Sequence, residues 1–216
     1  MQLYLNETSP FSRVVISTAL LSHTSSLTFR WVDPWSSPSN LIQANPFSLI
    51  PTLELDNGQA LYESLCICQF LIESSHSQLL HQVNFKKADE VSKLGTAKTL
   101  MEIAFRSAAL ARFTDNDNEL IERGRSGLSA ALTLLDEDMK TFGLESYLTP
   151  NLATLYLHVA LEYVQFRHAA LYQATETQQI DKFLQTSPFK KVLELISIDN
   201  LSTKPSYAEL ESKLVD

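Results

Sequence analysis

The sequence predicts an α/β domain followed by an all-α helical bundle domain. Two observations support this division. Residues 1–85 contain only two of the 17 basic residues and no lysine, whereas basic residues are frequent from residue 86 onward. The hydrophobic pattern changes at the same place, from short alternating runs to long runs with a helical period. The predicted parts are therefore 1–76 for the first domain, 77–86 for a polar linker and 87–216 for the helical domain.

The composition excludes several classes of protein. With 44% hydrophobic and 19% charged residues, the chain can bury a sizeable core, so bulk disorder is excluded. Five glycines and eight prolines are too few for the many tight turns of an all-β sandwich. A net charge of −8 argues against a nucleic-acid partner. Since no basic leader and no apolar run of about 18 residues is visible, we expect no membrane contact and a cytoplasmic location.

The cysteines and histidines predict no metal site. Cys66 and Cys68 are two positions apart on an expected helix, about 200° apart around its axis. They point too far apart to form a disulfide or to bind one ion, and we expect two small hydrophobic residues. The histidines are not grouped with other ligands at metal-binding spacing.

The first domain begins with a predicted strand, helix and second strand. Gln2–Leu5 is a short strand, and Ser9 followed by Pro10 is typical of a helix start, with Ser9 as the N-cap. The helix continues to about Ser22. Alternating apolar residues at 27, 29 and 31 predict the second strand. A helix between these two strands makes them parallel, with a right-handed crossover.

A hairpin and a second helix complete the predicted first domain. Thr52–Leu55 and Gln59–Tyr62 flank Asp56-Asn57-Gly58, a strong signal for a hairpin turn. A helix is predicted from about Glu63 to Glu73. The segment between the second strand and the hairpin, rich in serine and proline, is predicted to be a connector.

The second domain is predicted to consist of helices only. Two amphipathic periods, over about 94–108 and 120–139, each predict a helix with one buried face. A third helix, from Asn151 to about Tyr172, is apolar around most of its circumference, which is typical of the centre of a bundle. Weaker helices are predicted at Gln178–Gln185, Phe189–Ile196 and Tyr207–Leu214.

Four motifs, in the same order and spacing, resemble the cytosolic glutathione S-transferase superfamily, in particular its bacterial, serine-type members. They are Ser9-Pro10-Phe11-Ser12-Arg13, Asn45-Pro46 through Ile50-Pro51-Thr52-Leu53, Tyr62-Glu63-Ser64, and Asn151 through Thr154. The resemblance implies the glutathione S-transferase fold, with a thioredoxin-like first domain and an all-helical second domain. It also implies glutathione as co-substrate, a small hydrophobic electrophile as second substrate, and a homodimer.

The resemblance assigns catalysis to Ser9. A helix N-terminus presents free N–H groups and positive potential, which would stabilise the thiolate of glutathione. Ser9 would donate a hydrogen bond to the sulfur without attacking any atom itself. A plain N-cap is the alternative for this serine. Ser9 and Ser12 stand where thioredoxin-like redox proteins have their two cysteines, so disulfide exchange by these residues is excluded.

The resemblance assigns glutathione binding to Ile50, Glu63 and Ser64. A cis bond before Pro51 would expose the backbone N–H and C=O of Ile50 to the cysteinyl part of glutathione. The Ser64 hydroxyl and nearby N–H groups could hold the γ-glutamyl carboxylate, and Glu63 could face the α-amino group. A rigid turn at Pro51 and an ordinary helix start at Glu63 are the alternatives.

The sequence departs from the family pattern at two positions, and the first of them leads to a second hypothesis. Leu49 stands where a polar residue often holds the glycyl carboxylate of glutathione, and Thr154 stands where an aspartate is usual. The first departure favours a catalytically silent interaction or regulatory module on the same fold. Candidates to replace the missing contact are Arg13, Arg30, His23 and Gln43. For the electrophile, we expect a pocket wall formed by helical residues such as Met101, Phe105, Arg106 and Phe113.

Overall fold

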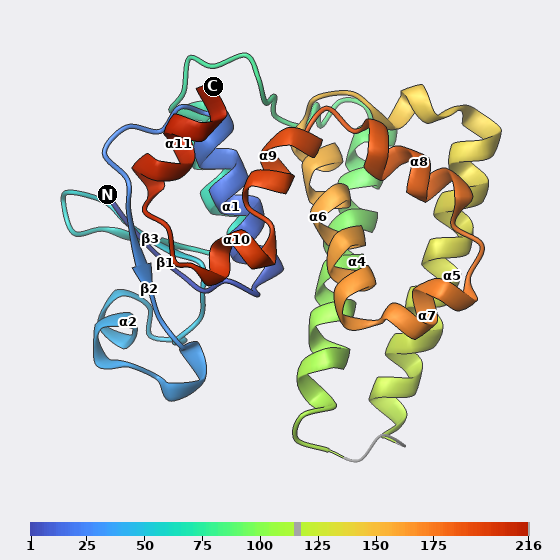
Figure 1. Ribbon diagram of the computed structural model, residues 1–216, viewed down its shortest axis with the longest axis horizontal. Helices are drawn as coiled ribbons and strands as arrows, with labels where there is room; N and C mark the ends of the chain where they lie inside the picture. Colours follow the sequence, from blue (N-terminus) through green and yellow to red (C-terminus); the bar gives the residue numbers. More distant parts are fainter. Residues whose placement is uncertain (115–117, 216) are drawn as a thin grey trace. The chain divides into compact units, whose positions relative to one another are not determined.

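A four-stranded sheet of order β2-β1-β3-β4 forms the centre of the N-terminal part of the computed structural model (Figure 1). Strand β1 pairs in parallel with β2 and antiparallel with β3, and β3 pairs antiparallel with β4. This arrangement confirms the predicted crossover and hairpin. The bounds are β1 (Gln2–Leu5), β2 (Thr28–Trp31), β3 (Thr52–Glu54) and β4 (Ala60–Tyr62).

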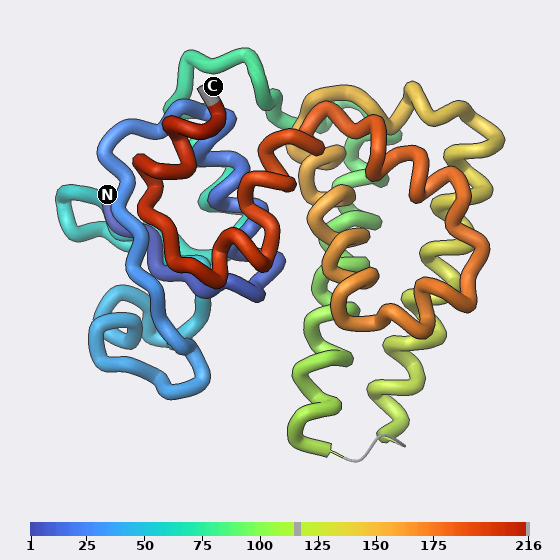
Figure 2. Tube along the Cα trace, in the orientation of Figure 1, coloured from blue at the N-terminus to red at the C-terminus, as the bar shows by residue number. Residues whose placement is uncertain are grey.

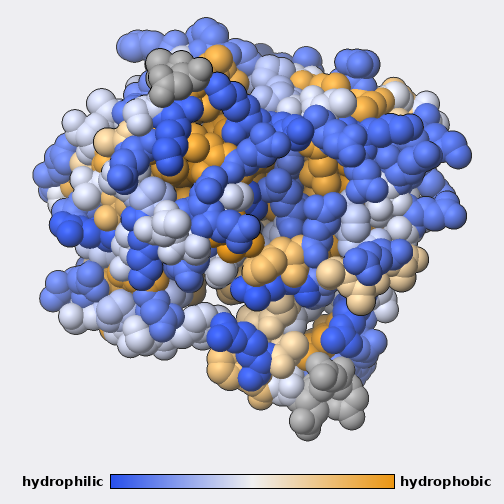
Figure 3. Space-filling view, in the orientation of Figure 1, coloured by the Kyte–Doolittle hydropathy of each residue, from blue (hydrophilic) through white to orange (hydrophobic). Residues whose placement is uncertain are grey.

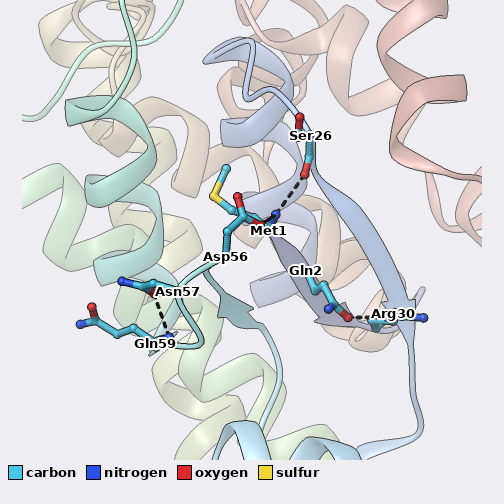
Figure 4. Close-up of polar contacts among 7 residues, drawn as sticks. All are labelled: Met1, Gln2, Ser26, Arg30, Asp56, Asn57 and Gln59. Atoms are coloured by element: carbon cyan, nitrogen blue, oxygen red, sulfur yellow. Dashed lines mark hydrogen bonds and ion pairs between the residues drawn. The ribbon is translucent and has the colours of Figure 1, made fainter.

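The predicted turn closes the hairpin between β3 and β4 (Figure 4). The backbone N–H of Gly58 donates to the carbonyl of Leu55, and the Asn57 side-chain oxygen accepts from the N–H of Gln59 at 2.9 Å. Gly58 has φ 81°, a conformation that residues with a side chain rarely adopt. The glycine is therefore required by the turn itself.

Two long helices of the N-terminal part have the predicted positions, whereas one short helix was missed. Helices α1 (Pro10–Leu21) and α3 (Ser64–Glu73) pack against each other. Between β2 and β3 lie a 3₁₀ turn, η1 (Pro34–Ser36), and α2 (Ser39–Ala44), where only a connector was predicted. Helix α2 has six residues and buries only Leu41, so it has no apolar period that could reveal it.

The C-terminal segment packs with the N-terminal residues in one compact unit. This unit, called unit 1, contains Met1–Gln82 and Lys191–Asp216. Figure 2 shows the end of the chain running beside α1. The Tyr207 hydroxyl donates to the carbonyl of Ala19 at 2.9 Å, and its ring meets Phe29 edge-on. Helices α9 (Lys190–Leu195), α10 (Ile198–Ser202) and α11 (Tyr207–Val215) form this segment. The units thus differ from the predicted division, which kept 87–216 together.

Residues Val83–Lys190 form unit 2, which is helical throughout its described elements. The structure describes residues 1–114 and 118–215 of the chain. The predicted third helix divides at His168, whose backbone leaves the helical region, so α6 ends at Arg167 and α7 follows. Within the described residues, no helix combines the length and the apolar character that crossing a membrane requires. The elements are α4 (Ala88–Leu110), α5 (Glu119–Phe142), η2 (Leu144–Tyr147), α6 (Leu152–Arg167), α7 (Ala169–Ala174) and α8 (Gln178–Thr186).

Asn151 is the N-cap of the buried helix α6 and also forms a hydrogen bond to a residue of α4. Its side-chain oxygen accepts from the N–H of Thr154 at 3.1 Å, and its side-chain nitrogen donates to Glu90 at 3.2 Å. Thr154 donates its hydroxyl to the carbonyl of Tyr147. A hydrogen bond from the Asn84 N–H is the main cause that lowers the pKa of Glu90, which keeps this acceptor ionised. The start of α6 is therefore capped even though Thr154 stands where the family usually has an aspartate.

We expect Asn151→Ala to lower the free energy of unfolding by about 1–2 kcal/mol, because the substitution removes a helix cap from a buried site. Urea denaturation followed by circular dichroism measures the change. Asn151→Asp keeps the capping oxygen but loses the donor to Glu90 and adds a second carboxylate, so it should also destabilise the protein. Two variants as stable as the parent chain would contradict a structural role for Asn151.

Candidate functional site

The pairing register of the sheet brings three of the sequence motifs to one edge. Tyr4 near the end of β1 pairs with Thr52 at the start of β3, and Thr52 pairs with Tyr62 at the end of β4. The loop after β1, the loop before β3 and the residues after β4 therefore leave the sheet at the same edge. These are the segments that contain Ser9, the Ile50–Pro51 bond and the Glu63–Ser64 pair.

Ser9 is the N-cap of α1, as predicted. Its Oγ accepts from the backbone N–H of Ser12 at 3.2 Å, and its own N–H donates to the side-chain oxygen of Asn6 at 2.9 Å. Ser9 is 7% exposed. Among the described residues, no acceptor for the Ser9 hydroxyl proton is found. The geometry therefore supports the cap and leaves one hydrogen-bond donor at the helix N-terminus.

Arg13, one helical turn beyond Ser9, is buried and binds the C-terminal segment. Its Nε donates to the carbonyl of Ile196 at 3.1 Å, and its Nη2 donates to the carbonyl of Leu193 at 3.5 Å. The side chain is only 4% exposed. Arg13 is therefore not placed to replace the missing contact to a glycyl carboxylate, which corrects one expectation from the sequence.

The other candidates for that contact are also placed elsewhere. Arg30 donates its Nε to the Gln2 side chain at 2.6 Å. His23 follows the far end of the twelve-residue helix α1, about 18 Å along the axis from Ser9. Gln43 lies on the short helix α2. Leu49 itself is 62% exposed.

The Ile50–Pro51 peptide bond is cis, as expected. Asn45, which is 1% exposed, organises the loop before it. The Asn45 side-chain nitrogen donates to the carbonyl of Leu49 at 3.1 Å and to Oγ1 of Thr52 at 3.0 Å. The Thr52 hydroxyl donates to the same carbonyl at 2.8 Å. The sequence motif contained Asn45, but its role in fixing the loop was not predicted.

Glu63 has an unusual backbone and is the N-cap of α3. Its φ of 74° lies in a region that few residues with a side chain occupy, and such positions are enriched at functional sites. Its Oε2 accepts from the N–H of Leu65 at 3.0 Å, and the Ser64 hydroxyl donates to its Oε1 at 3.5 Å. Ser64 is 2% exposed. The carboxylate of Glu63 thus already contacts the helix start at which a ligand carboxylate was predicted.

The expected wall of the electrophile pocket is only partly consistent with the structure. Met101 is fully buried in unit 2, which corrects the prediction that it faces a pocket. Phe113 is 68% exposed and Arg106 is exposed as well. Within residues 1–114 and 118–215, no three His, Cys, Asp or Glu side chains come together as metal ligands.

Comparisons with known proteins find a matching family for the N-terminal residues and several structures of similar fold. Residues 3–78 match the family described as glutathione S-transferase, N-terminal domain. A glutathione transferase family member from Pseudomonas fluorescens Pf-5, solved with bound glutathione, has a TM-score of 0.73 at 23% identity, covering 84% of this chain and 91% of that one. A glutathione S-transferase from Methylobacillus flagellatus, also solved with glutathione, has a TM-score of 0.69 at 19% identity, with 88% and 97% covered.

More distant matches show the same architecture. Gtt2 from Saccharomyces cerevisiae has a TM-score of 0.63 at 17% identity, covering 88% of this chain and 99% of that chain. Comparison with the curated proteins gives no match. At these identities the likeness shows the fold. The chain has a thioredoxin-like N-terminal domain and a mostly helical C-terminal region, as in the glutathione S-transferase fold.

We expect Arg13→Met to lower the free energy of unfolding by about 1.5–3 kcal/mol, since hydrogen bonds from a charged donor to buried carbonyls are lost. Urea denaturation measures this change, and hydrogen exchange in residues 191–202 should become faster. Arg30→Met is the matched control, because Arg30 is exposed and should cost less than about 1 kcal/mol. Equal losses in the two variants would show that Arg13 does not anchor the C-terminal segment.

Proposed function

We propose that this chain binds glutathione at the sheet edge described above and is a glutathione transferase of the serine type. The observation that carries the proposal is the placement of Ser9, which caps α1 while its hydroxyl proton has no acceptor among the described residues. The glutathione bound in the structures from Pseudomonas fluorescens and Methylobacillus flagellatus supports the same choice of ligand.

The proposed mechanism uses Ser9 and the N-terminus of α1 to stabilise a thiolate. The glutathione thiol loses its proton to solvent, and the sulfur then faces the positive end of the helix dipole and its free N–H groups. Ser9 donates a hydrogen bond to the sulfur. The thiolate attacks an electrophilic carbon of a small hydrophobic substrate. As the carbon–sulfur bond forms, the bond from that carbon to a leaving group breaks, and the leaving group departs to solvent with the electron pair. No covalent bond to the protein is needed at any stage.

The remaining predicted residues would hold the peptide part of glutathione. The backbone N–H and C=O of Ile50, next to the cis bond at Pro51, would pair with the cysteinyl segment. Ser64 and the N–H groups at the start of α3 would hold the γ-glutamyl carboxylate, and Glu63 would face the α-amino group. The resemblance further suggests a homodimer in the cytoplasm.

Leu49 favours a second candidate function, a catalytically silent interaction or regulatory module. Its exposed apolar side chain stands where a polar contact to glutathione is usual, and Arg13 and Arg30 are engaged elsewhere. Losing a charge-assisted contact costs about 1.5–3 kcal/mol, roughly ten- to a hundredfold in affinity. Titration of glutathione in a calorimeter distinguishes the two functions, since the absence of heat at millimolar ligand would favour the module.

If glutathione binds, Ser64→Ala should weaken binding by about tenfold, because a hydrogen bond to a charged group is lost. Glu145→Ala, which removes an exposed acid in unit 2, should leave the dissociation constant unchanged. The measurement is isothermal calorimetry on both variants. Equal effects in the two variants would mean that the carboxylate is held somewhere else.

Ser9→Ala should raise the pKa of the bound glutathione thiol while barely changing its affinity. A hydrogen bond to a charged acceptor is worth about 1.5–3 kcal/mol, so turnover near neutral pH should fall about tenfold or more. Ultraviolet titration of the thiolate and a conjugation assay measure the two effects.

Ser9→Gly is the control for the capping role, because glycine costs only a few tenths of a kcal/mol at an N-cap. Both variants should lose activity to a similar extent, although only Ser9→Ala should lose about 1 kcal/mol of stability. Full activity and an unchanged thiol pKa in both variants would show that Ser9 is only an N-cap.

A further inference from the structure

The turn between β3 and β4 contains the only Asn-Gly pair in the chain. Gly58 follows Asn57, whereas every other asparagine is followed by a larger residue. The backbone nitrogen of a residue can attack the side-chain amide of an asparagine before it, because the product is a five-membered ring. A side chain on the attacking residue crowds its nitrogen, and glycine has none. Apart from the two chain neighbours of Gly58, no described residue places an atom within 4 Å of the position that a Cβ would take.

Solvent reaches this turn. Its exposed residues are Asp56, Asn57, Gly58 and Gln59. On the side of the molecule seen in Figure 3, hydrophilic residues cover most of the surface, with apolar residues between them. Water, and the hydroxide ion that can remove the proton of the Gly58 N–H, therefore have access to the turn.

The side chain of Asn57 is directed back toward the backbone that follows it (Figure 4). Its Oδ1 accepts from the N–H of Gln59 at 2.9 Å, an Asx turn. This hydrogen bond closes a ring of atoms that contains both the amide carbon, Cγ, and the Gly58 nitrogen. During an attack on Cγ, negative charge develops on Oδ1, and a donor that already contacts this oxygen stabilises the charge. The turn therefore holds the two reacting atoms in one small ring and supplies a donor for the oxygen.

One hydrogen bond of the turn opposes the reaction. The Gly58 N–H donates to the carbonyl of Leu55 at 2.9 Å, so it must leave this acceptor before the nitrogen can lose its proton. A hydrogen bond of this kind lowers the reactive population by roughly tenfold at most. The gain from holding the reacting groups together within one chain is larger. The Leu55 contact therefore slows the reaction without preventing it.

We propose that Asn57 is a site of spontaneous modification in the folded chain, through a succinimide ring formed with Gly58 and assisted by the Gln59 N–H. The Gly58 nitrogen gives its proton to hydroxide and attacks Cγ of Asn57, forming a carbon–nitrogen bond. The bond from Cγ to Nδ2 breaks, and Nδ2 takes a proton from water and leaves as ammonia.

Water then opens the ring in one of two ways. It adds to one of the two ring carbonyl carbons and breaks the bond from that carbon to the Gly58 nitrogen, which regains a proton. Breaking the bond to Cγ gives aspartate at residue 57. Breaking the bond to the main-chain carbon gives isoaspartate, in which the chain continues through the former side chain.

Both products change the hairpin. Each adds a negative charge at residue 57, next to Asp56, and isoaspartate also lengthens the main chain by one carbon inside the turn. Two backbone hydrogen bonds close this turn, from the N–H of Leu55 to the carbonyl of Gln59 at 2.8 Å and from Gly58 to Leu55. Strands β3 and β4 have only three residues each, so the isoaspartate product should loosen their pairing. No step involves glutathione, so the proposal does not depend on the proposed function.

The test incubates the full chain at mildly alkaline pH without denaturant and maps its peptides by mass spectrometry. Asn57 should lose its amide at least about tenfold faster than Asn40, because Asn40 is followed by Leu41. Asn40 is the matched control within the same sample, since it is exposed as well. The rate at Asn57 should rise with pH, because the Gly58 nitrogen must lose a proton. Endoproteinase Asp-N cleaves before aspartate but not before isoaspartate, and it should show that isoaspartate is in excess.

Two substitutions at residue 59 test the assistance by the turn. Gln59→Pro removes the N–H that donates to Oδ1 and should slow the loss of the amide several-fold, whereas Gln59→Ala keeps this N–H and should react as the parent chain does. Asn57→Gln should keep its amide, because its longer side chain would have to form a six-membered ring. Should Gln59→Pro fail to fold, as judged by circular dichroism, the comparison of Asn57 with Asn40 in the parent chain still decides the site.

Three results would each overturn the proposal. The first is an equal rate of amide loss at Asn57 and Asn40. The second is amide loss at Asn57 in urea but not in the folded chain. The third is an unchanged rate in a folded Gln59→Pro chain.

Discussion

The burial of helix α1 is the constraint on which the rest of unit 1 depends. Every residue of this helix except Phe11 is buried, so a polar group on it is costly unless it finds a partner inside the protein. The Ser12 hydroxyl has no such partner in the part of the chain that the structure describes. Ser17 and Thr18 donate their hydroxyls to backbone carbonyls one turn back, and Arg13 reaches the carbonyls of the C-terminal segment. These partners hold the helix in place, with Ser9 as its cap at the sheet edge.

Local sequence patterns predicted most of the fold because most elements have a clear period or a clear end. Strand alternation, the Asp56-Asn57-Gly58 turn and the long helical periods all correspond to observed elements. Short elements such as α2 and α10 were missed, since five or six residues cannot show a helical period. The packing of 191–215 with the N-terminal residues depends on contacts across more than 180 positions, such as Arg13 to Ile196, which no local pattern contains.

Short sequence motifs predicted the backbone features of the candidate site. The hydrogen-bond partners of its side chains were predicted less well. The cap at Ser9 and the cis bond at Pro51 follow from short motifs. The engagement of Arg13 and Arg30 could not be predicted, because their partners lie on strands and helices that meet only in the folded chain. The same holds for Asn45, whose amide joins Leu49 and Thr52 before β3 begins.

The carboxylate of Glu63 occupies the start of α3, where it would compete with the carboxylate of a ligand for the same N–H groups. Because it is attached next to the N–H groups that it contacts, its effective concentration is on the order of millimolar. Under the proposed function, a free carboxylate would have to displace it, so weak anions at lower concentration would not bind. A ligand that also carries an amino group would bind more tightly, since the displaced Glu63 carboxylate could then contact that amino group. At the proposed site, the attached carboxylate would thus favour zwitterionic amino-acid ends over simple anions.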